Sequence, residues 1–550
     1  MSNFAVVRHI RHLRRYQHIL NVFVRHGFGF ALTQLPMQRK WVHLLRGGPS
    51  VEAQTLPSHF RQALEDLGPT FIKLGQVLST RPDLLPPAYI AELSRLQDTV
   101  PPVAWEKIQS VIKEELDASP RTLFRHIAPQ PMAAASLGQV HAAILPDGTE
   151  VVIKVQRPNI RKTIEMDLEI LHDLAQYVER HTALGKVYEL EGIAREFADT
   201  LHAEMNYRQE ATNAERFREN FAGEHTLYIP RVYWEYTTQK VLVLERLEGI
   251  KIDNIGALEA AGYDRHQIAK HAAQLTVKEI LEDGFFHADP HPGNFVVLED
   301  EVIGAMDFGM VGYLSDEDRI NLTRLYIVSV QMDAHGVVDE LVHIGAAPAD
   351  VDRSELAQEI SSLLRRYEGL PLKEVSAARV MNEIRPIVFR HHLHLPSNYW
   401  LLGKTLAMME GIGRKLDPGF DIFAFSKPYV RKLLFEIVLP NRRWLERTLR
   451  RSLLWGDLLD EVPRTGMLLL QRLQNRDPIP LTLEKSVLDR LDNLFSRLAL
   501  SLLVTGITIG VALVIPATID ITWVRAVLYV SFGVALILGV WVLVSILRQS

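Results

Sequence analysis

The sequence lacks several features that would place it in a familiar class of protein. Its 550 residues include no cysteine, which excludes disulfide bonds, thiolate metal sites and thiol catalysis. The 61 lysines and arginines do not exceed the 66 aspartates and glutamates, so the charge balance gives no indication of a nucleic-acid partner. The first residues lack the short apolar core and cleavage site of a signal peptide, and no internal repeat or low-complexity tract is present. We therefore expect an intracellular protein that is long enough for a large packed core with extensions.

One short polar stretch is the most informative part of the chain. Residues 287–294 read His-Ala-Asp-Pro-His-Pro-Gly-Asn, and an Asp-Phe-Gly triplet begins at Asp307. The pattern H-x-D-x(4)-N followed by D-F-G is that of a kinase catalytic loop. Asp289 would orient the proton of an attacking hydroxyl or water, while Asn294 and Asp307 offer the hard oxygen ligands that suit Mg²⁺ on phosphates. The triplet alone is common by chance, but the combination predicts a site for ATP and Mg²⁺.

The phosphate-binding elements are expected upstream of this loop. Residues 151–155 form an apolar, β-branched run with one lysine, which predicts the strand whose lysine, Lys154, pairs with the α- and β-phosphates. An alanine-rich segment before it occupies the place of the glycine-rich loop of kinases. The residues predicted to contact the nucleotide there are Ala133, Ala134, Ala135, Ser136, Gly138 and Val140. Because an alanine methyl restricts the backbone and its approach to phosphates, we expect the nucleotide to be held differently than in a usual kinase.

Two further regions complete the predicted nucleotide site. Glu210, in a helical stretch, is the candidate ion-pair partner of Lys154, with a solvated carboxylate on a helix face as the alternative. Residues 241–247 predict a buried strand that runs into a hinge, where backbone groups near Glu245 and Leu247 would contact the adenine edge. A plain core strand fits the same residues.

The residues after the Asp-Phe-Gly triplet differ from those of a protein kinase. The chain passes almost at once to Ser315 and an acidic segment, which predicts a helix N-cap and first turn. A protein kinase would have an activation segment there to present peptide substrates. The sequence therefore favours a small molecule, a lipid or water as the phosphoryl acceptor.

Two almost uncharged apolar stretches near the C-terminus, 498–515 and 526–547, predict a transmembrane hairpin. A hydrophobic pair inside a soluble core is the alternative. Arginines outside both ends of the pair predict that both ends of the hairpin lie in the cytoplasm. The G-x-x-x-G at 506–510 would either close the hairpin or support a homodimer, and the sequence leaves both open.

Two basic stretches with interleaved apolar residues, 7–16 and 442–455, are further candidates for membrane contact. Each predicts an amphipathic helix that lies on anionic lipid head groups. A helix packed on the domain with a solvated basic face fits each stretch equally well.

With these motifs in place, the chain resembles the UbiB/ADCK group of atypical protein-kinase-like proteins. The likeness is carried by a K-x-G-Q element at 73–76 with the residues 78–86 and 96–98, by the alanine-rich loop, and by the sequence of 287–294. The resemblance implies an α+β, two-lobed protein-kinase-like fold with a helical N-terminal K-x-G-Q extension, plus the C-terminal transmembrane hairpin.

In this family the extension covers the active site and excludes protein substrates, and its lysine pairs with the glutamate of an E-x-D motif. The resemblance therefore implies regulatory roles for Lys73, Gln76 and Glu204. Asn206 occupies the place of the motif's aspartate, which is a departure from the family pattern.

The resemblance also implies a function. Members of this group are membrane-anchored atypical kinases or ATPases, so the chain is expected to bind Mg·ATP. The resemblance also implies that it supports ubiquinone biosynthesis by ATP-driven handling of prenylated lipid intermediates. Membrane lipids, prenylated quinone precursors and other quinone-biosynthesis proteins are the expected partners. Two alternatives stay open: a small-molecule or lipid kinase, since the catalytic loop also resembles that of aminoglycoside-type phosphotransferases, and a nucleotide-binding scaffold of a membrane complex.

The predicted organisation follows from these elements and from Pro478 and Pro480, which mark a break before the last helices. The predicted segments are a basic amphipathic N-terminal segment (1–50), the K-x-G-Q extension (51–125), a kinase-like N-lobe with a helical insertion (126–248), a C-lobe (249–440), an amphipathic linker (441–497) and two transmembrane helices (498–547).

Overall fold

The computed structural model describes residues 3–28, 55–81, 83–96, 100–182, 189–348, 350–370, 374–421 and 425. All of them belong to the first of two units, Met1–Asn441, and none to the second, Arg442–Ser550. The predicted linker, the second basic stretch and the predicted transmembrane pair therefore lie outside the described residues. Across the part that is described, no helix is both long and apolar enough to span a membrane.

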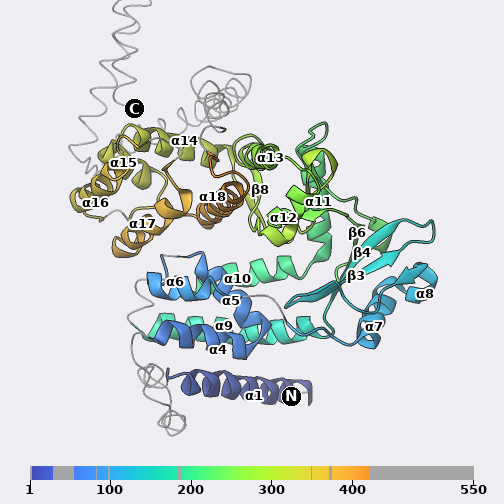
Figure 1. Cartoon of the computed structure of the whole chain (residues 1–550). Helices are drawn as coiled ribbons and strands as arrows, with labels where there is room; N and C mark the ends of the chain where they lie inside the picture. The colour runs from blue at the N-terminus through green and yellow to red at the C-terminus, as the bar shows by residue number, and fades with distance from the viewer. Residues whose placement is uncertain are drawn as a thin grey trace, which may run out of the picture. The chain divides into compact units, whose positions relative to one another are not determined.

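An antiparallel sheet forms the N-terminal lobe (Figure 1). Its strands run in the order β1-β3-β4-β6, with β2 beside β3; they are β1 (His126–Ile127), β2 (Ala133–Ala134), β3 (Gly138–Ile144), β4 (Glu150–Gln156) and β6 (Val241–Glu245). Side chains alternate along β4, so Val151, Ile153 and Val155 are fully buried in a cluster with residues of helix α7 (Trp105–Leu116). Lys154 lies on the opposite face. The predicted strand at 151–155 is confirmed.

Helices precede the sheet and are inserted after β4. The helices α4 (Leu56–Leu67), α5 (Pro69–Ser79) and α6 (Pro87–Leu93) pack beside α9 (Ile160–His181) and α10 (Leu190–Glu204), as Figure 1 shows. Gly68 separates α4 from α5 with φ +95°, and Pro69 begins α5, where a missing N–H costs nothing. Leu64, Leu67 and Phe71 are all buried, in a cluster with residues of α6 and α9.

The C-terminal lobe combines short strands with long helices. One sheet has the order β5 (Leu227–Tyr228), β10 (Ile303–Ala305), β9 (Phe295–Val297), β7 (Ile250–Lys251), and β11 (Val311–Tyr313) pairs with β8 (Phe285–His287). Its helices are α12 (Ile255–Ala260), α13 (Arg265–Val277), α14 (Asp316–Val330), α15 (Ala334–His343), α16 (Arg353–Arg365), α17 (Ala377–Arg390) and α18 (Ser397–Leu416). Helix α11 (Tyr207–Asn220) shares the main core of this lobe with α13 and α18.

Several short helices complete the described fold. They are α8 (Pro120–Leu123), the 3₁₀ turns η3 (Trp234–Tyr236), η5 (Pro292–Asn294) and η6 (Glu299–Glu301), and the π-helix η4 (Lys278–Asp283). The π-helix η4 continues directly from α13 and leads into β8, which carries the start of the catalytic loop. The irregular turn thus lies next to the predicted active site, where π-helices are often found.

The segment after the Asp-Phe-Gly triplet is short and ordered. Strand β11 returns to pair with β8, and α14 then begins with a complete capping box. The Ser315 hydroxyl accepts from the Asp318 N–H at 3.1 Å, and the Asp318 carboxylate accepts from the Ser315 N–H at 2.9 Å. The predicted N-cap is confirmed.

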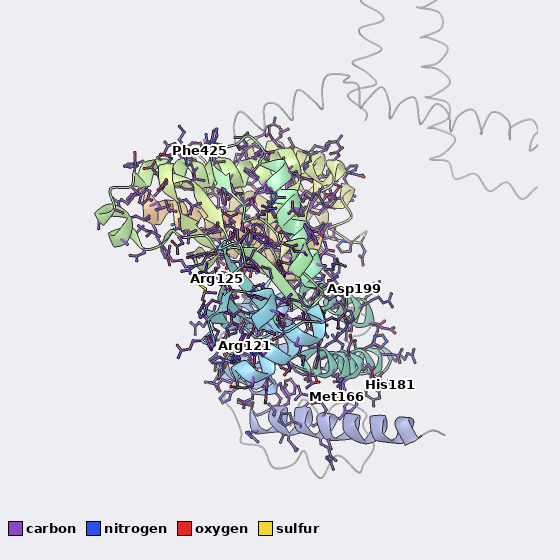
Figure 2. The ribbon with its side chains drawn as sticks, turned by 90° about the vertical axis from the view of Figure 1, so that its right-hand side faces the viewer. Arg121, Arg125, Met166, His181, Asp199 and Phe425 are labelled. Atoms are coloured by element: carbon purple, nitrogen blue, oxygen red, sulfur yellow. The ribbon has the colours of Figure 1, made fainter. Side chains whose placement is uncertain are left out.

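The N-terminal helix α1 (Asn3–Arg25) packs on the domain. Ile19 and Val22 are buried in a cluster with residues of α4 and α9, and Figure 2 shows α1 below the helix that carries Met166 and His181. Arg15 donates to both oxygens of Asp167 at 2.7 and 2.9 Å, and Asp167 is fully buried. For the residues of α1 whose side chains are described, the packed-helix alternative therefore holds.

Replacing Arg15 by alanine tests this docking. The change leaves the buried Asp167 carboxylate unpaired, which should destabilise the contact by about 3 kcal/mol. Hydrogen–deuterium exchange of α1 should accelerate accordingly. Arg14→Ala is the matched control, because Arg14 is exposed on the same helix and its loss should change exchange very little. Equal exchange in the two variants would show that the Arg15 pair does not hold α1.

Candidate active site

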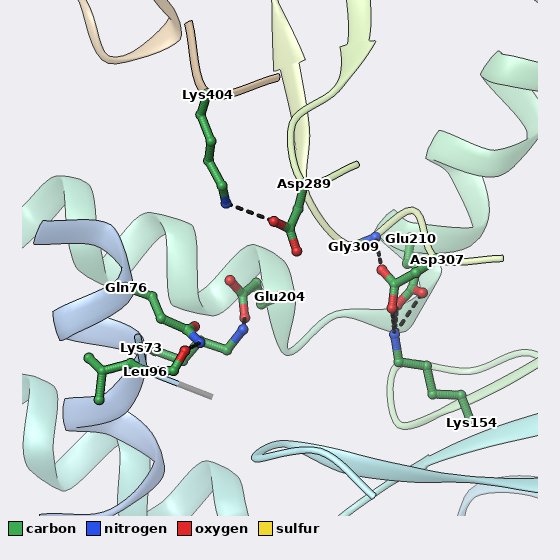
Figure 3. Close-up of polar contacts among 10 residues, drawn as sticks. All are labelled: Lys73, Gln76, Leu96, Lys154, Glu204, Glu210, Asp289, Asp307, Gly309 and Lys404. Atoms are coloured by element: carbon green, nitrogen blue, oxygen red, sulfur yellow. Dashed lines mark hydrogen bonds and ion pairs between the residues drawn. The ribbon is translucent and has the colours of Figure 1, made fainter. Parts of the chain in front are cut away.

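Three charged side chains from different elements meet at the centre of the predicted nucleotide site (Figure 3). The ammonium of Lys154 on β4 lies 2.7 and 2.8 Å from the two oxygens of Glu210 on α11, and 3.1 Å from Oδ2 of Asp307. The ring of Tyr207 has its centre 5.3 Å from the same ammonium. Glu210 is 5 % exposed, so the alternative of a solvated carboxylate is wrong.

The electrostatics of this cluster keep Asp307 ionised. Burial raises the pKa of the Glu210 carboxyl to about 7, although Lys154 acts in the opposite direction. Burial by itself would also raise the pKa of the Asp307 carboxyl. The charge of Lys154 and the N–H of Gly309, 2.9 Å from Oδ1, outweigh that effect and hold this pKa well below its usual range. Asp307 is thus a carboxylate at neutral pH, as a metal ligand must be.

The catalytic loop places Asp289 and Asn294 between β8 and β9. The N–H of Asp289 lies 3.2 Å from Nδ1 of His287, and the amide nitrogen of Asn294 donates to the Asp289 carbonyl at 3.2 Å. This second bond fixes the Asn294 amide and leaves its oxygen as the atom available to a ligand.

The donor set at Asn294 and Asp307 fits Mg²⁺. An ionised carboxylate and an amide oxygen are ligands of the kind that this hard cation takes. The described residues contain no group of three or more histidine or acidic side chains able to hold a metal. A two-ligand site of this kind suits Mg²⁺ that is completed by phosphate oxygens and waters, rather than a metal enclosed by protein.

Lys404 was not predicted from the sequence, yet it contacts the catalytic loop. Its ammonium, from helix α18, lies 2.7 Å from Oδ1 of Asp289 (Figure 3). No motif spacing could indicate it, because the contact depends on how α18 packs. The only local indication in the sequence is that this lysine is flanked by Leu402, Gly403 and Thr405, small or uncharged residues that the structure shows to be buried.

The alanine-rich loop begins in the sheet. Ala133 is opposite Val140, and Val140 is opposite Lys154, so these three side chains form one row across the sheet. Ala133 and Ala135 are exposed, Ala134 is half-buried, and the Ala135 N–H donates to the Gly138 carbonyl at 2.8 Å.

The inner side of this loop is tightly packed. The Ser136 side chain is fully buried, so it does not face a ligand in this conformation. A side chain at Gly138 would collide with the hydroxyl of Tyr207 and lie 2.7 Å from the Val155 carbonyl. Glycine is required here by close packing and not by a left-handed backbone.

Only some of the polar groups in the predicted hinge remain available to bind a nucleotide. Val241 to Leu244 are buried, which confirms the strand, and the Glu245 N–H already donates to the Arg231 carbonyl at 2.9 Å. The Glu245 carboxylate accepts from the Tyr228 hydroxyl at 2.9 Å. Within the described part of the chain, the Leu247 N–H makes no hydrogen bond, so it is a backbone donor that remains for an adenine edge.

The K-x-G-Q helix is joined to the nucleotide site through α10. Lys73 of α5 lies 2.9 Å from the carboxylate of Glu204, the last residue of α10, and Gln76 donates to the Leu96 carbonyl at 3.4 Å (Figure 3). Helix α11, which carries Glu210, begins three residues after Glu204. Asn206 is the N-cap residue of α11, with its side-chain oxygen buried.

A buried acid lies beneath the catalytic loop. Glu279 of η4 is 3 % exposed and accepts from the His287 N–H at 3.2 Å. Burial raises the pKa of Glu279 to about 8, and the His287 bond opposes this only in part. Burial also lowers the pKa of His287, which favours a neutral imidazole at neutral pH.

Comparison with known proteins agrees with this geometry. Three family models match along the chain: an ABC1 atypical kinase-like domain at 95–341, a UbiB helical domain at 360–421, and an ABC1/UbiB kinase-like C-terminal domain at 483–548. The first model spans the sheet, the catalytic loop and the Asp-Phe-Gly triplet, and with the described elements it supports an α+β kinase-like fold.

Two curated relatives and one solved structure illustrate the similarity. The chain is 39 % identical over 376 residues to uncharacterized protein sll1770 of Synechocystis, covering 68 % of this chain and 64 % of that protein, slightly less than two thirds. It is 36 % identical over 430 residues to a probable protein kinase UbiB of Cellvibrio japonicus, covering 78 % of each. The Rv3197–erythromycin complex from Mycobacterium tuberculosis aligns with this chain at a TM-score of 0.47 and 23 % identity. The alignment covers 64 % of this chain and 90 % of that one.

The buried Glu279 predicts a measurable pH dependence of stability. Its pKa is about 8 in the folded protein against 4.5 ordinarily, so between these values the unfolded chain releases a proton that the folded protein retains. The free energy of unfolding should fall as pH rises from about 5 to about 8, by up to ~1.4 kcal/mol per unit, and level off above. Glu279→Gln, which keeps the hydrogen-bond acceptor, should remove the share of this fall that Glu279 contributes, while Glu210, whose pKa is also raised, keeps its own share.

Urea unfolding at pH 5.5, 7 and 8.5 measures the difference. Glu114→Gln, an exposed glutamate on α7, is the control and should follow the wild type at every pH. Parallel pH profiles for Glu279→Gln and the wild type would show that Glu279 is ionised in the folded protein at neutral pH.

Proposed function

Because the chain belongs to the UbiB/ADCK family of atypical kinase-like proteins, we propose that it is a membrane-anchored ATPase that supports ubiquinone biosynthesis. Turnover of Mg·ATP drives the handling of prenylated lipid intermediates. One observation carries the proposal: Lys154 contacts Glu210 and Asp307 at once. That arrangement brings the phosphate-binding lysine, its glutamate partner and the predicted metal-binding carboxylate to one place, and phosphoryl transfer in kinases requires all three.

Each residue of the site has a role in this reaction. Lys154, oriented by Glu210, binds the α- and β-phosphates, and Asn294 and Asp307 hold Mg²⁺, which neutralises charge on the phosphates when bound. Asp289 takes the proton of the attacking water as the water oxygen bonds to the γ-phosphorus and the bond from phosphorus to the ADP oxygen breaks. Asp289 then releases the proton to solvent, so ATP and water give ADP, phosphate and a proton.

The acceptor is proposed to be water, with lipid handling coupled to turnover. The chain from Asp307 passes through β11 directly into α14, and this leaves no platform for a peptide. The Lys73–Glu204 pair holds the K-x-G-Q helix against α10, next to the helix that carries Glu210. Both features favour an acceptor smaller than a protein.

The proposed location is a bacterial inner membrane. The apolar stretches at 498–515 and 526–547 are each long enough to cross the hydrocarbon core, and a family-specific C-terminal model matches 483–548. The kinase-like domain and both termini lie in the cytoplasm. Membrane lipids, prenylated quinone precursors and other enzymes of the pathway are the proposed partners, and the G-x-x-x-G at 506–510 offers a route to a homodimer.

The substitution Asp307→Asn tests the proposal. The amide keeps the shape of the side chain but removes the charge that would hold Mg²⁺. Phosphate release from Mg·ATP by the full chain in nanodiscs should fall on the order of 100-fold or more. Asp300→Asn makes the same chemical change at an exposed turn and should leave turnover unchanged.

Nanodiscs with and without anionic lipid extend the same measurement. Release that rises with anionic lipid and is lost in Asp307→Asn would support a membrane-stimulated ATPase. A labelled lipid or small molecule after incubation with γ-labelled ATP would instead indicate a kinase. Nucleotide binding without release or labelling would indicate a scaffold, and unchanged release by Asp307→Asn would remove the site assignment itself.

A further inference from the structure

The catalytic loop has no cation of its own. Residues 287–294 contain neither lysine nor arginine, although the group transferred next to Asp289 would be a phosphoryl group with several negative charges. Lys154 is already engaged by Glu210 and Asp307, on the side of the site where the α- and β-phosphates are expected. A second positive charge near Asp289 would complement the developing charge of the reaction.

Helix α18 brings such a charge to the loop. The Lys404 ammonium lies 2.7 Å from Oδ1 of Asp289, and the hydroxyl of the next residue, Thr405, donates to the His287 carbonyl at 3.0 Å. Two consecutive side chains of one helix therefore contact the loop at two points. Lys404 and Asp289 are 33 % and 41 % exposed, so a ligand can reach both.

The position of Lys404 is fixed by the packing of α18. Met409, Ile412 and Leu416 lie in the main core with α11 and α13. The buried Glu410 accepts from the Ala377 N–H at 2.7 Å at the start of α17. The backbone of α18 is thus held on both sides, while the four-carbon stem of Lys404 can turn its ammonium from Asp289 towards a nearby anion.

We propose that Lys404 binds the γ-phosphoryl group of the bound nucleoside triphosphate. An attacking oxygen must lie about 2.6–3.2 Å from Asp289 and about 3–3.5 Å from the γ-phosphorus. An ammonium in contact with the same carboxylate is therefore within reach of the γ-phosphoryl oxygens. The inference rests on the proposed function, because it assumes a nucleoside triphosphate at this site.

A comparison of two nucleotides tests this without requiring turnover. Binding of Mg·AMP-PNP and Mg·ADP is measured by calorimetry on the full chain in nanodiscs, for the wild type and Lys404→Gln. Loss of a charged hydrogen bond to the γ-phosphate should weaken Mg·AMP-PNP about 10-fold or more, and Mg·ADP less than about 2-fold. Lys404→Arg should retain most of the preference for the triphosphate. The Mg·ADP affinity also shows that each variant is folded.

Two controls separate phosphate binding from a structural role. Thr405→Val removes the neighbouring contact between α18 and the loop without changing charge, and the ratio of the two affinities should stay that of the wild type. Lys415→Gln removes an exposed charge from the last turn of α18, and it should leave both affinities unchanged.

Three outcomes would overturn the inference. If Lys404→Gln keeps the wild-type ratio, Lys404 only holds Asp289, and the proposed ATPase function is untouched. The inference also fails if Thr405→Val or Lys415→Gln shifts the ratio as much as Lys404→Gln does. Absence of binding of either nucleotide to the wild type would overturn the proposed function together with the inference.

Discussion

Two carboxylates, Glu210 and Asp307, lie against one ammonium, Lys154, and the rest of the site depends on this balance of charge. Without the lysine, the buried Glu210 carboxyl would lie beside a second negative charge, and both burial and that charge favour its protonation. With it, Asp307 stays ionised, while burial raises the pKa of Glu210 to about 7. Because the three side chains come from β4, α11 and the loop after β10, the same cluster joins the two lobes.

Ion pairs between oppositely charged side chains also hold the helical N-terminal extension in place. Its apolar faces share a buried cluster with α9, but an apolar interface by itself permits small shifts in register. Arg15 with Asp167 joins α1 to α9, and Lys73 with Glu204 joins α5 to α10. Removing Arg15 or Lys73 would take the ion pair from a largely buried carboxylate, that of Asp167 or Glu204, so each pair favours one alignment of its helices.

The parts of the site that follow a fixed local spacing could be predicted from the sequence. Asp289, Asn294 and Asp307 are of this kind, and strand β4 is predicted by the run of β-branched residues around Lys154. Lys404 could not be predicted in this way, because its contact with Asp289 joins residues 115 positions apart through the packing of a helix.

Other differences between prediction and structure also come from contacts between residues that are distant in sequence. The Glu245 N–H of the predicted hinge is already used, since it is bonded to the Arg231 carbonyl beside the isolated bridge between Val232 and Leu244. For α1, sequence periodicity predicts an apolar face but does not say what covers it. The structure answers this for the second half of the helix, where Ile19 and Val22 meet α4 and α9.

The close contact between Gly138 and Tyr207 has a mechanical consequence. Tyr207 is the first residue of the helix that carries Glu210, and its hydroxyl fills the space beside Gly138 where a side chain would otherwise lie. A movement of the start of α11 would therefore shift Tyr207 beside Gly138 and Glu210 beside Lys154 together. The alanine-rich loop and the central ion pair are in this way both coupled to the same helix.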